Sequence, residues 1–564
     1  MAYKRLGDIL IANGAIDQEQ LKTALEIQRH NGNRIGQILM DEKFITEEQL
    51  VEALREQLGV EYVDLASEAI NPALASLLPK KIAREHLIAP VRSNGDDLYL
   101  AMVDPLNFVA IDEAKQATRR RIIPLIATSS AMERALVMLY GAEGANKALE
   151  ELELVEEDSS DQADVETHTL DSDDSNSAPT IRLVNSIIER AAAEGASDIH
   201  LEPLESEMAV RMRIDGVLRK VLSVPKKSQS AVISRIKVIG AMDIAERRIP
   251  QDGRANVRVR GADIDLRIST LPTIYGEKVV IRLLNKSSQL ISLEGVGLDG
   301  QNLDNVLSLL RNSNGVILIV GPTGSGKSST MSAMVQKLNT EQVNLVTLED
   351  PVEYNINGVN QVQINEKTGM TFASGLRSIL RQDPDIIAVG EIRDGETSEI
   401  AMRSAITGHL VISTLHTNDA VSTIDRLIDM GTPVYLLYSA MRGVISQRLV
   451  RRICPRCKEV YTPTDDELRM LGLSRQEVSK HTIYHGKGCP DCFDTGYRGR
   501  TAVFEIMMIT DKVRQTIARG ATRQELLEVL KTEGFHTLQD DCMRLVYEGV
   551  TSLEEVLRTV NSGD

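Results

Sequence analysis

Residues 316–328 read VILIVGPTGSGKS, an apolar run followed by a glycine-rich loop. Five consecutive apolar residues, Val316–Val320, predict a buried parallel strand. The loop that follows matches the pattern G-x4-G-K-S/T at every fixed position, and a helix is expected after it. Its N–H groups wrap phosphates, the lysine reaches the β- and γ-phosphates, and the serine binds Mg²⁺. The predicted ATP- and Mg²⁺-binding residues are Gly321, Pro322, Thr323, Gly324, Ser325, Gly326, Lys327, Ser328 and Ser329.

Three later apolar runs, 343–348, 386–389 and 410–413, predict further parallel strands of the same α/β core. Carboxylates follow two of them, where strand ends meet the phosphate loop. Glu349 is the candidate base or water-orienting group, and Glu391 is the candidate Mg²⁺ carboxylate acting through water. The sequence leaves open that these two roles are exchanged. His409 and His416 flank the last strand and are predicted to sense the γ-phosphate, with His416 preferred.

The chain has 564 residues, too many for one core, and predicts about three to five domains. No run approaches the roughly 18–20 apolar residues of a membrane span, and no secretory signal pattern is present. A cytoplasmic protein is therefore expected. The net charge of −17 disfavours a nucleic-acid partner, which would need a basic surface. Residues 150–174 contain twelve acidic residues and no Lys or Arg, which predicts a flexible linker.

Changes of pattern along the chain divide it into five segments. Residues 1–60 are a tandem helical repeat, 61–145 a small α/β domain, and 146–178 the acidic linker. Residues 179–290 alternate as the strands of an α+β domain after an amphipathic helix. The nucleotide-binding core occupies 291–564, with a cysteine-bearing subdomain at 450–500. The predicted class is a multidomain α/β protein.

Two C-x2-C pairs predict a metal site. Cys454 and Cys457 are separated from Cys489 and Cys492 by 31 residues. Four thiolates suit a tetrahedral structural Zn²⁺ with no position left open for chemistry. Redox chemistry is the alternative, but no thioredoxin-like pattern surrounds the pairs. Cys542 is expected to be a small core residue.

Several motifs together resemble the secretion and pilus-assembly ATPases. LEDPVEY (348–354), GEIRD (390–394) and TGHLVISTLHTND (407–419) are similar to that family's Asp box, atypical Walker B and His box. GASDIHLEP (195–203), PQDGR (250–254) and RISTLPTIYGEK (267–278) resemble its N2 domain. The resemblance implies a RecA-like core and a homo-hexameric ring in which Arg267 and Arg282 contact phosphate. It places Arg377, Arg381 and Arg500 at the ATP and subunit interfaces.

The resemblance also implies a motor that works on an inner-membrane platform protein and meets the membrane only through partners. The tetracysteine site is typical of the pilus-assembly and secretion branches, and the retraction branch generally lacks it. We expect hydrolysis of ATP to drive type IV pilus assembly. A type II secretion ATPase is the close alternative, because both share every motor motif. A nucleotide-sensing hub with little turnover is a lesser one, and a nucleic-acid translocase is disfavoured by charge.

The first sixty residues repeat themselves at an offset of 29. Each copy predicts two helices, and the repeat resembles the cyclic di-GMP-binding domain found at the N-terminus of some of these ATPases. The resemblance implies that arginines bind guanine and phosphate, leucines give apolar contact and glutamines polar contact. Ile35 replaces a leucine and Lys43 a glycine, and the second change can alter a turn. A helical adaptor for a membrane partner is the alternative. The implied contacts are Arg5, Leu6, Gly7, Leu10, Leu21, Leu25, Gln28, Arg34, Ile35, Gly36, Leu39, Leu50, Leu54 and Gln57.

Overall fold

The computed structural model describes residues 6–31, 35–65, 72–129, 131–132, 135–136, 139–140, 179–259, 262–285 and 292–561. The chain divides into two compact units, Met1–Asn285 and Lys286–Asp564. The predicted linker, 146–178, lies outside the described residues. Among those that are described, no helix is both long and apolar enough to cross a membrane.

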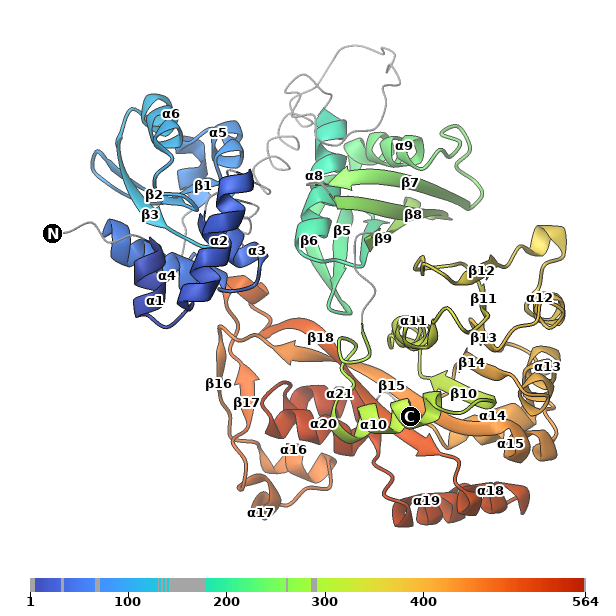
Figure 1. Ribbon diagram of the computed structural model, residues 1–564. Coiled ribbons are helices and arrows are strands. Elements are labelled where there is room, and N and C mark those ends of the chain that lie inside the picture. Colours follow the sequence, from blue (N-terminus) through green and yellow to red (C-terminus); the bar gives the residue numbers. More distant parts are fainter. Residues whose placement is uncertain are drawn as a thin grey trace. The chain divides into compact units, whose positions relative to one another are not determined.

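The second unit is built on a seven-stranded sheet with the order β12-β11-β13-β14-β10-β15-β18 (Figure 1). Neighbouring strands run parallel from β12 to β15, and only β18 is antiparallel to its neighbour. The four apolar runs of the sequence are β10, β11, β13 and β14, as predicted. The strands are β10 (Gly315–Val320), β11 (Leu345–Glu349), β12 (Asn360–Gln363), β13 (Ile386–Val389), β14 (Leu410–Leu415), β15 (Met441–Ile453) and β18 (Tyr497–Met508).

Helices cover both faces of this sheet, which is why its central strands β10, β13 and β14 are fully buried and mostly apolar. Ile317 and Ile319 of β10 pack in one cluster with helices α10 (Gly300–Leu310) and α11 (Lys327–Leu338). Val316, Leu318 and Val320 pack in another, on the opposite face. That face carries α12 (Phe372–Ile379), α13 (Gly395–Ile406), α14 (Ser422–Asp429), α15 (Val434–Ala440), α18 (Asp511–Ala518) and α19 (Arg523–Thr532).

The rest of the second unit surrounds the long strands β15 and β18. Helices α20 (Leu538–Tyr547) and α21 (Leu553–Asn561) share a core with Val450 and Val503. The short strands β16 (Lys458–Val460) and β17 (Tyr484–Gly486) pair antiparallel. The segment that connects them contains the short helices α16 (Asp465–Met470) and α17 (Arg475–Val478).

The first unit ends in a six-stranded antiparallel sheet with the order β6-β5-β4-β9-β8-β7. Helices α8 (Pro179–Ala193) and α9 (Gln229–Ile239) bury one face of it through a shared apolar cluster. This matches the predicted α+β pattern. The strands are β4 (Asp198–Pro203), β5 (Glu207–Ile214), β6 (Val217–Pro225), β7 (Gln251–Val259), β8 (Ala262–Thr273) and β9 (Gly276–Asn285).

The N-terminal repeat of the sequence is also a structural repeat. Helices α1 (Leu6–Ala12) and α2 (Gln18–Asn31) recur as α3 (Ile35–Asp41) and α4 (Glu47–Leu58), each starting 29 residues later. The turn between helices uses a left-handed residue in both copies, Gly14 at φ 69° and Lys43 at φ 59°. Lys43 therefore keeps the turn rather than altering it. A three-stranded sheet follows, of β1 (Ile88–Asn94), β2 (Asp97–Met102) and β3 (Arg121–Ile126), with helices α5 (Lys80–Glu85) and α6 (Phe108–Thr118).

Candidate nucleotide site

The glycine-rich loop joins β10 to α11 and is pressed against β15. A Cβ on Gly321 would lie 2.4 Å from the carbonyl oxygen of Gln447, and one on Gly326 would lie 2.8 Å from its Nε2. Both glycines also have positive φ, so space and backbone conformation each exclude a larger residue. Thr330 of α11 donates a hydrogen bond of 2.7 Å to Gln447 Oε1. The strand β15 therefore fixes the shape of the loop.

Lys327, the first residue of α11, is folded back onto this loop. Its Nζ donates to the carbonyl oxygens of Gly321, at 2.8 Å, and Pro322, at 3.0 Å. Burial lowers the pKa of Lys327 to about 8; the nearby Glu391 carboxylate opposes this shift and Arg448 adds to it. The ammonium thus lacks a full counter-charge, which the β- and γ-phosphates of a nucleotide would supply.

Glu349 ends β11 and is held in one orientation. The side chain is 8% exposed. Its Oε1 accepts hydrogen bonds from Thr347 Oγ1, at 2.6 Å, and from Gln361 Nε2, at 3.0 Å. A carboxylate fixed in this way at the carboxyl edge of the sheet can orient a water molecule or take a proton from it.

Glu391 lies just beyond β13, next to β11 and β14. Its carboxylate contacts the guanidinium of Arg393 and, at 3.4 Å from Oε2, the Nε2 of His416. The backbone on each side is tied to both neighbouring strands, because Gly390 N donates to Leu348 O and Ile392 N to Thr414 O. The structure therefore brings Glu391 and His416 together at the edge where the phosphate loop begins.

His409 does not reach this edge. His409 precedes β14, and its backbone oxygen accepts a hydrogen bond from the N–H of Gly315, the first residue of β10. The phosphate loop instead follows the last residue of β10. The Nδ1 of His409 lies 2.9 Å from the carbonyl oxygen of Ser404. The parallel strands place His409 at the end of the sheet opposite the phosphate loop, and its expected role in sensing the γ-phosphate stays a prediction.

Arg377 on α12 and Arg381, two residues beyond the end of that helix, are exposed, and neither forms a hydrogen bond to the described phosphate loop. Arg377 contacts Glu396, and Arg381 donates to the carbonyl oxygen of Arg377 at 2.8 Å. Their expected role at a subunit interface stays a prediction.

Arg448 is a residue of this region that the sequence did not single out. It lies on β15 directly after Gln447, is 8% exposed, and has no hydrogen-bond partner for Nε among the described residues. Its Nη2 donates a long hydrogen bond of 3.4 Å to the carbonyl oxygen of Asn418, two residues after His416. Burial lowers the pKa of this guanidinium. Arg448 stands out because its guanidinium is buried in the folded protein, and no local sequence pattern predicts that burial.

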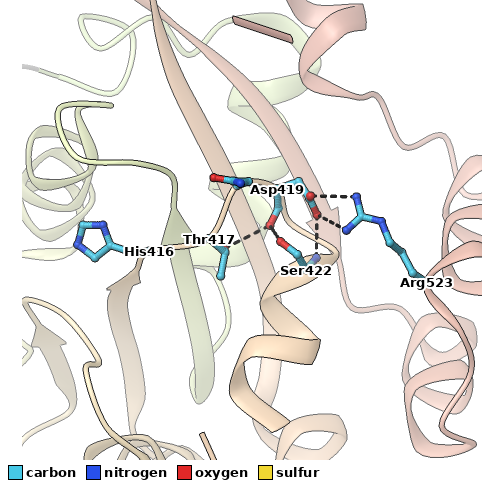
Figure 2. Close-up of a pocket in the computed structure, with 6 residues that line it drawn as sticks. His416, Thr417, Asp419, Ser422 and Arg523 are labelled. Carbon is cyan, nitrogen blue, oxygen red and sulfur yellow. Dashed lines mark hydrogen bonds and ion pairs between the residues drawn. The ribbon is translucent and has the colours of Figure 1, made fainter. Parts of the chain in front are cut away.

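A pocket of about 430 Å³ opens beside His416 and is lined by Thr417, Asn418, Asp419, Ser422 and Arg523. Arg523 Nη2 lies 2.9 Å from Asp419 Oδ2, and Asp419 Oδ1 accepts from Ser422 N at 2.7 Å. Figure 2 shows the His416 ring pointing away from this ion pair. The ion pair fixes the loop that carries His416.

The four predicted metal ligands form one cluster. The sulfur atoms of Cys454, Cys457, Cys489 and Cys492 lie within 4.8 Å of one another. Three of the separations are 3.9, 3.8 and 3.6 Å. Sulfurs about 2.3 Å from a tetrahedral zinc ion are about 3.8 Å apart, so the residues fit Zn²⁺. Backbone N–H groups of Cys489 and Gly496 point at Cys492 Sγ, both at 3.2 Å, and would stabilise its thiolate.

Comparison with known proteins decides the family. The family described as "Type II/IV secretion system protein" matches residues 173–558, which include both the antiparallel sheet and the nucleotide site. This chain belongs to that family. The membership confirms the prediction of an ATPase and the resemblance to secretion and pilus-assembly motors. A second family, the MshEN domain, matches residues 58–146, the segment after the helical repeat.

Several relatives align with nearly the whole length of this chain. It is 42% identical over 99% of its length to the type IV pilus assembly ATPase PilB of Thermus thermophilus, of which it covers 66%. It is 40% identical to PilB of Myxococcus xanthus, with 98% of each chain covered. It is 37% identical to the type II secretion system protein E of Xanthomonas campestris, over 99% of this chain and 98% of that one. The solved ATPase DotB of Yersinia pseudotuberculosis shares the fold, with a TM-score of 0.51, 20% identity, and 71% of this chain and 99% of that chain covered.

The residues that the resemblance implies as contacts of phosphate and of cyclic di-GMP, outside the nucleotide-binding core, lie in the first unit. Arg267 and Arg282 are cross-strand neighbours on β8 and β9. Arg5 and Arg34 lie outside the described residues. Leu10 and Leu39 are fully buried in the repeat's own core, and their expected contact with a ligand stays a prediction. Gly7 and Gly36 are covered by Leu21 and Leu50, which would be 2.7 and 2.8 Å from an added Cβ. Leu25 is 41% exposed and remains available. The remaining residues of the predicted set, Leu6, Ile35, Gln28, Leu54 and Gln57, are at least partly accessible.

Proposed function

We propose that this chain is the motor ATPase of type IV pilus assembly and that ATP hydrolysis drives pilin polymerisation. The observation that supports this most is the meeting of Lys327, Glu349, Glu391 and His416 around the carboxyl edge of one sheet. Two pilus assembly ATPases align with nearly the whole chain.

The residues at this edge divide the chemistry among them. Lys327 binds the β- and γ-phosphates, and Glu349 orients the attacking water. Ser328 and, through water, Glu391 would hold Mg²⁺, which neutralises charge on the phosphates. His416, in contact with Glu391, responds to the γ-phosphate and transmits its presence to the loop fixed by Asp419 and Arg523. In this way, hydrolysis changes the state of a loop that other parts of the machine can contact.

The proposal includes a homo-hexamer in the cytoplasm, at the inner face of the membrane, acting on an inner-membrane platform protein. The tetracysteine cluster holds a structural zinc ion. The MshEN-matched segment and the helical repeat bind cyclic di-GMP and regulate the motor, as the resemblance implies. Support for the regulation comes from the family match at 58–146 and from the recurrence of the helix starts and of the left-handed turn residue at an offset of 29.

Genetic complementation tests the proposal. A deletion strain should lose surface pili, and the native gene should restore them while the Lys327→Ala variant should not. Normal piliation in the deletion strain would contradict it. The second candidate is a type II secretion motor, favoured by the Xanthomonas relative that also spans the whole chain. Loss of exported enzymes with pili intact would establish that candidate instead. A nucleotide-sensing hub needs bound ATP but little turnover, so Glu349→Gln, which loses hydrolysis, should restore its function as well as the native gene does.

A further inference from the structure

Three charged side chains from later in the chain hold the loop that carries His416. They contact three successive residues of this loop, so each of these residues is held separately. The pairs are Asn418 with Arg448, Asp419 with Arg523 (Figure 2), and Ala420 with Glu505. The side chain of Arg523 is half-exposed, and Arg448 makes only a long hydrogen bond of 3.4 Å. The contact of Glu505 is the shortest of the three and is buried.

Glu505 of β18 joins this loop to helix α20. Its side chain is 6% exposed. Oε1 accepts a hydrogen bond of 2.8 Å from the backbone N–H of Ala420, and Oε2 accepts one of 3.2 Å from that of Leu538, the first residue of α20. The carboxylate forms no ion pair with any residue that the structure describes. Both of its oxygens therefore bind backbone, one in the loop and one at the start of the helix.

The strand register places Glu505 level with the nucleotide site. Four residues on neighbouring strands are paired in sequence across the sheet, namely Leu415, Val320, Ser446 and Glu505. His416 directly follows the first of them, and the phosphate loop directly follows the second. Ala420 is fully buried in the apolar cluster that contains Val320. The loop thus runs from His416 along the carboxyl edge of the sheet, and Glu505 fixes its far end.

The chemistry of this position requires two acceptors. A buried carboxylate costs free energy, and a neutral side chain of the same size would cost less. Burial raises the pKa of Glu505, and the hydrogen bonds from the N–H groups of Ala420 and Leu538 oppose this shift. A glutamine has one acceptor oxygen, and its NH₂ group would face an N–H. Only a carboxylate can hold the loop and the helix at the same time.

We infer that Glu505 is a positioning residue for ATP hydrolysis, which fixes His416 beside Glu391 by tying the His416 loop to α20. This inference rests on the proposed role of His416 in the response to the γ-phosphate. Glu505 acts only through the loop, so its removal affects the hydrolytic step rather than the binding of ADP. The same two hydrogen bonds carry a displacement of the loop to α20.

The test compares Glu505→Gln with a matched variant in the full-length protein. We expect kcat to fall about tenfold in Glu505→Gln, with ADP affinity unchanged, because a hydrogen bond to a charged group is lost away from the bound nucleotide. The control is Asp541→Asn. Asp541 is also a buried carboxylate, 5% exposed, but its hydrogen bonds go to Phe504 N, at 2.8 Å, and to Arg544. Asp541→Asn should keep the native kcat even where it lowers the thermal unfolding midpoint.

A double-mutant cycle with His416→Ala separates positioning from general stability. If Glu505 acts through His416, the double variant should have the kcat of His416→Ala alone, because nothing remains to be positioned. Losses that multiply in the double variant, a native kcat in Glu505→Gln, or an equal fall in Asp541→Asn would overturn the inference. Native turnover in His416→Ala would instead remove the role of His416 on which the inference rests.

A second variant tests the same link without changing a buried charge. Leu538→Pro removes only the N–H that donates to Glu505 Oε2. Proline suits this first helical position, and the preceding Thr537 already has the extended backbone that a residue before proline adopts, with ψ 164°. We expect kcat to fall in Leu538→Pro when His416 is present and to stay at the His416→Ala level when it is absent. A native kcat in Leu538→Pro would overturn the link to α20, whether or not Glu505→Gln folds.

Discussion

The ammonium of Lys327 donates a hydrogen bond to the carbonyl oxygen of Gly321 at 2.8 Å, across the loop that both residues delimit. The loop thus binds its own lysine before any phosphate arrives. Desolvation of this lysine lowers its pKa to about 8. ATP must replace the contact with a stronger one, and binding therefore depends on the protonation of Lys327.

The first prediction follows from that dependence. The form of Lys327 that binds phosphate is the charged ammonium. In the ligand-free protein the pKa of Lys327 is about 8 instead of 10.5. Below pH 8 the ammonium is already present, and above it ATP binding must take up a proton. The dissociation constant for ATP should rise as pH rises through 8, by about tenfold at pH 9. Calorimetry in buffers of different ionisation enthalpy would measure both the affinity and the proton uptake.

The control for this experiment lies on the same helix. Lys337 of α11 is exposed, so Lys337→Ala should keep the native affinity and its pH dependence. Lys327→Ala should abolish turnover, because the variant lacks the positive charge that the lysine side chain brings to the β- and γ-phosphates. A flat pH profile in the native protein, or turnover in Lys327→Ala, would contradict the assigned site.

The second prediction separates the roles of Glu349 and Glu391. Glu349→Gln should lower kcat by roughly 10²- to 10⁴-fold, the contribution of a general base, without changing the Mg²⁺ concentration needed for half-maximal rate. Glu391→Gln should raise that Mg²⁺ requirement and slow hydrolysis while ATP still binds. Glu353→Gln, in the exposed part of the same turn as Glu349, is the control and should be unaffected. The opposite pattern of Mg²⁺ dependence would show that the two roles are exchanged.

The sequence predicted the sheet and much of the site because both depend on local patterns. Buried parallel strands are continuous apolar runs, and the loop at Gly321–Ser328 has fixed spacing. Residues at the ends of strands were harder to place. His409 and His416 flank the same strand, but only the end that carries His416 adjoins the phosphate loop. Arg448 was missed because its burial depends on the packing of β15 against the rest of the sheet.

The repeat shows the same limit in another form. Its period predicted two equivalent pairs of helices, and the structure has them. The repeat period did not predict which leucines face inward, because the buried side of such short helices is set by the helices that pack against them. Leu10 and Leu39 lie in the repeat's core, whereas Leu25 is exposed. The replacement of glycine by Lys43 was tolerated at a positive φ, at a cost of roughly 1 kcal/mol.

The third prediction concerns the cysteine cluster. Protein purified without chelators should contain about one Zn²⁺ per chain, because four thiolates make one closed site. Cys457→Ser should lose the metal and lower the thermal stability of the surrounding subdomain, since metal binding contributes directly to folding there. The buried Cys542 lies outside the cluster, so Cys542→Ser should keep the zinc. Native protein without zinc, or zinc retained at full occupancy in Cys457→Ser, would remove the assignment.

The last prediction concerns cyclic di-GMP. The ligand is two-fold, with two guanines and two phosphates, and the repeat supplies Arg5 and Arg34 at equivalent positions. Removing either arginine from the full-length protein should cost roughly 1–3 kcal/mol, or one to two decades in affinity. Removing both should abolish measurable binding and any effect of the ligand on ATP turnover. Isothermal calorimetry with the purified chain measures the binding directly.

The matched control for these arginines is Arg55, an exposed residue of α4 paired with Glu52 at 3.3 Å. It has no place in the repeated pattern, so Arg55→Ala should bind the ligand normally. If affinity falls equally in Arg55→Ala, the loss reflects surface charge rather than two specific contacts. If the native chain shows no saturable binding at high micromolar ligand, the regulatory role fails. The helical repeat would then be an adaptor that docks on a membrane partner, while the predictions for the nucleotide site would stand unchanged.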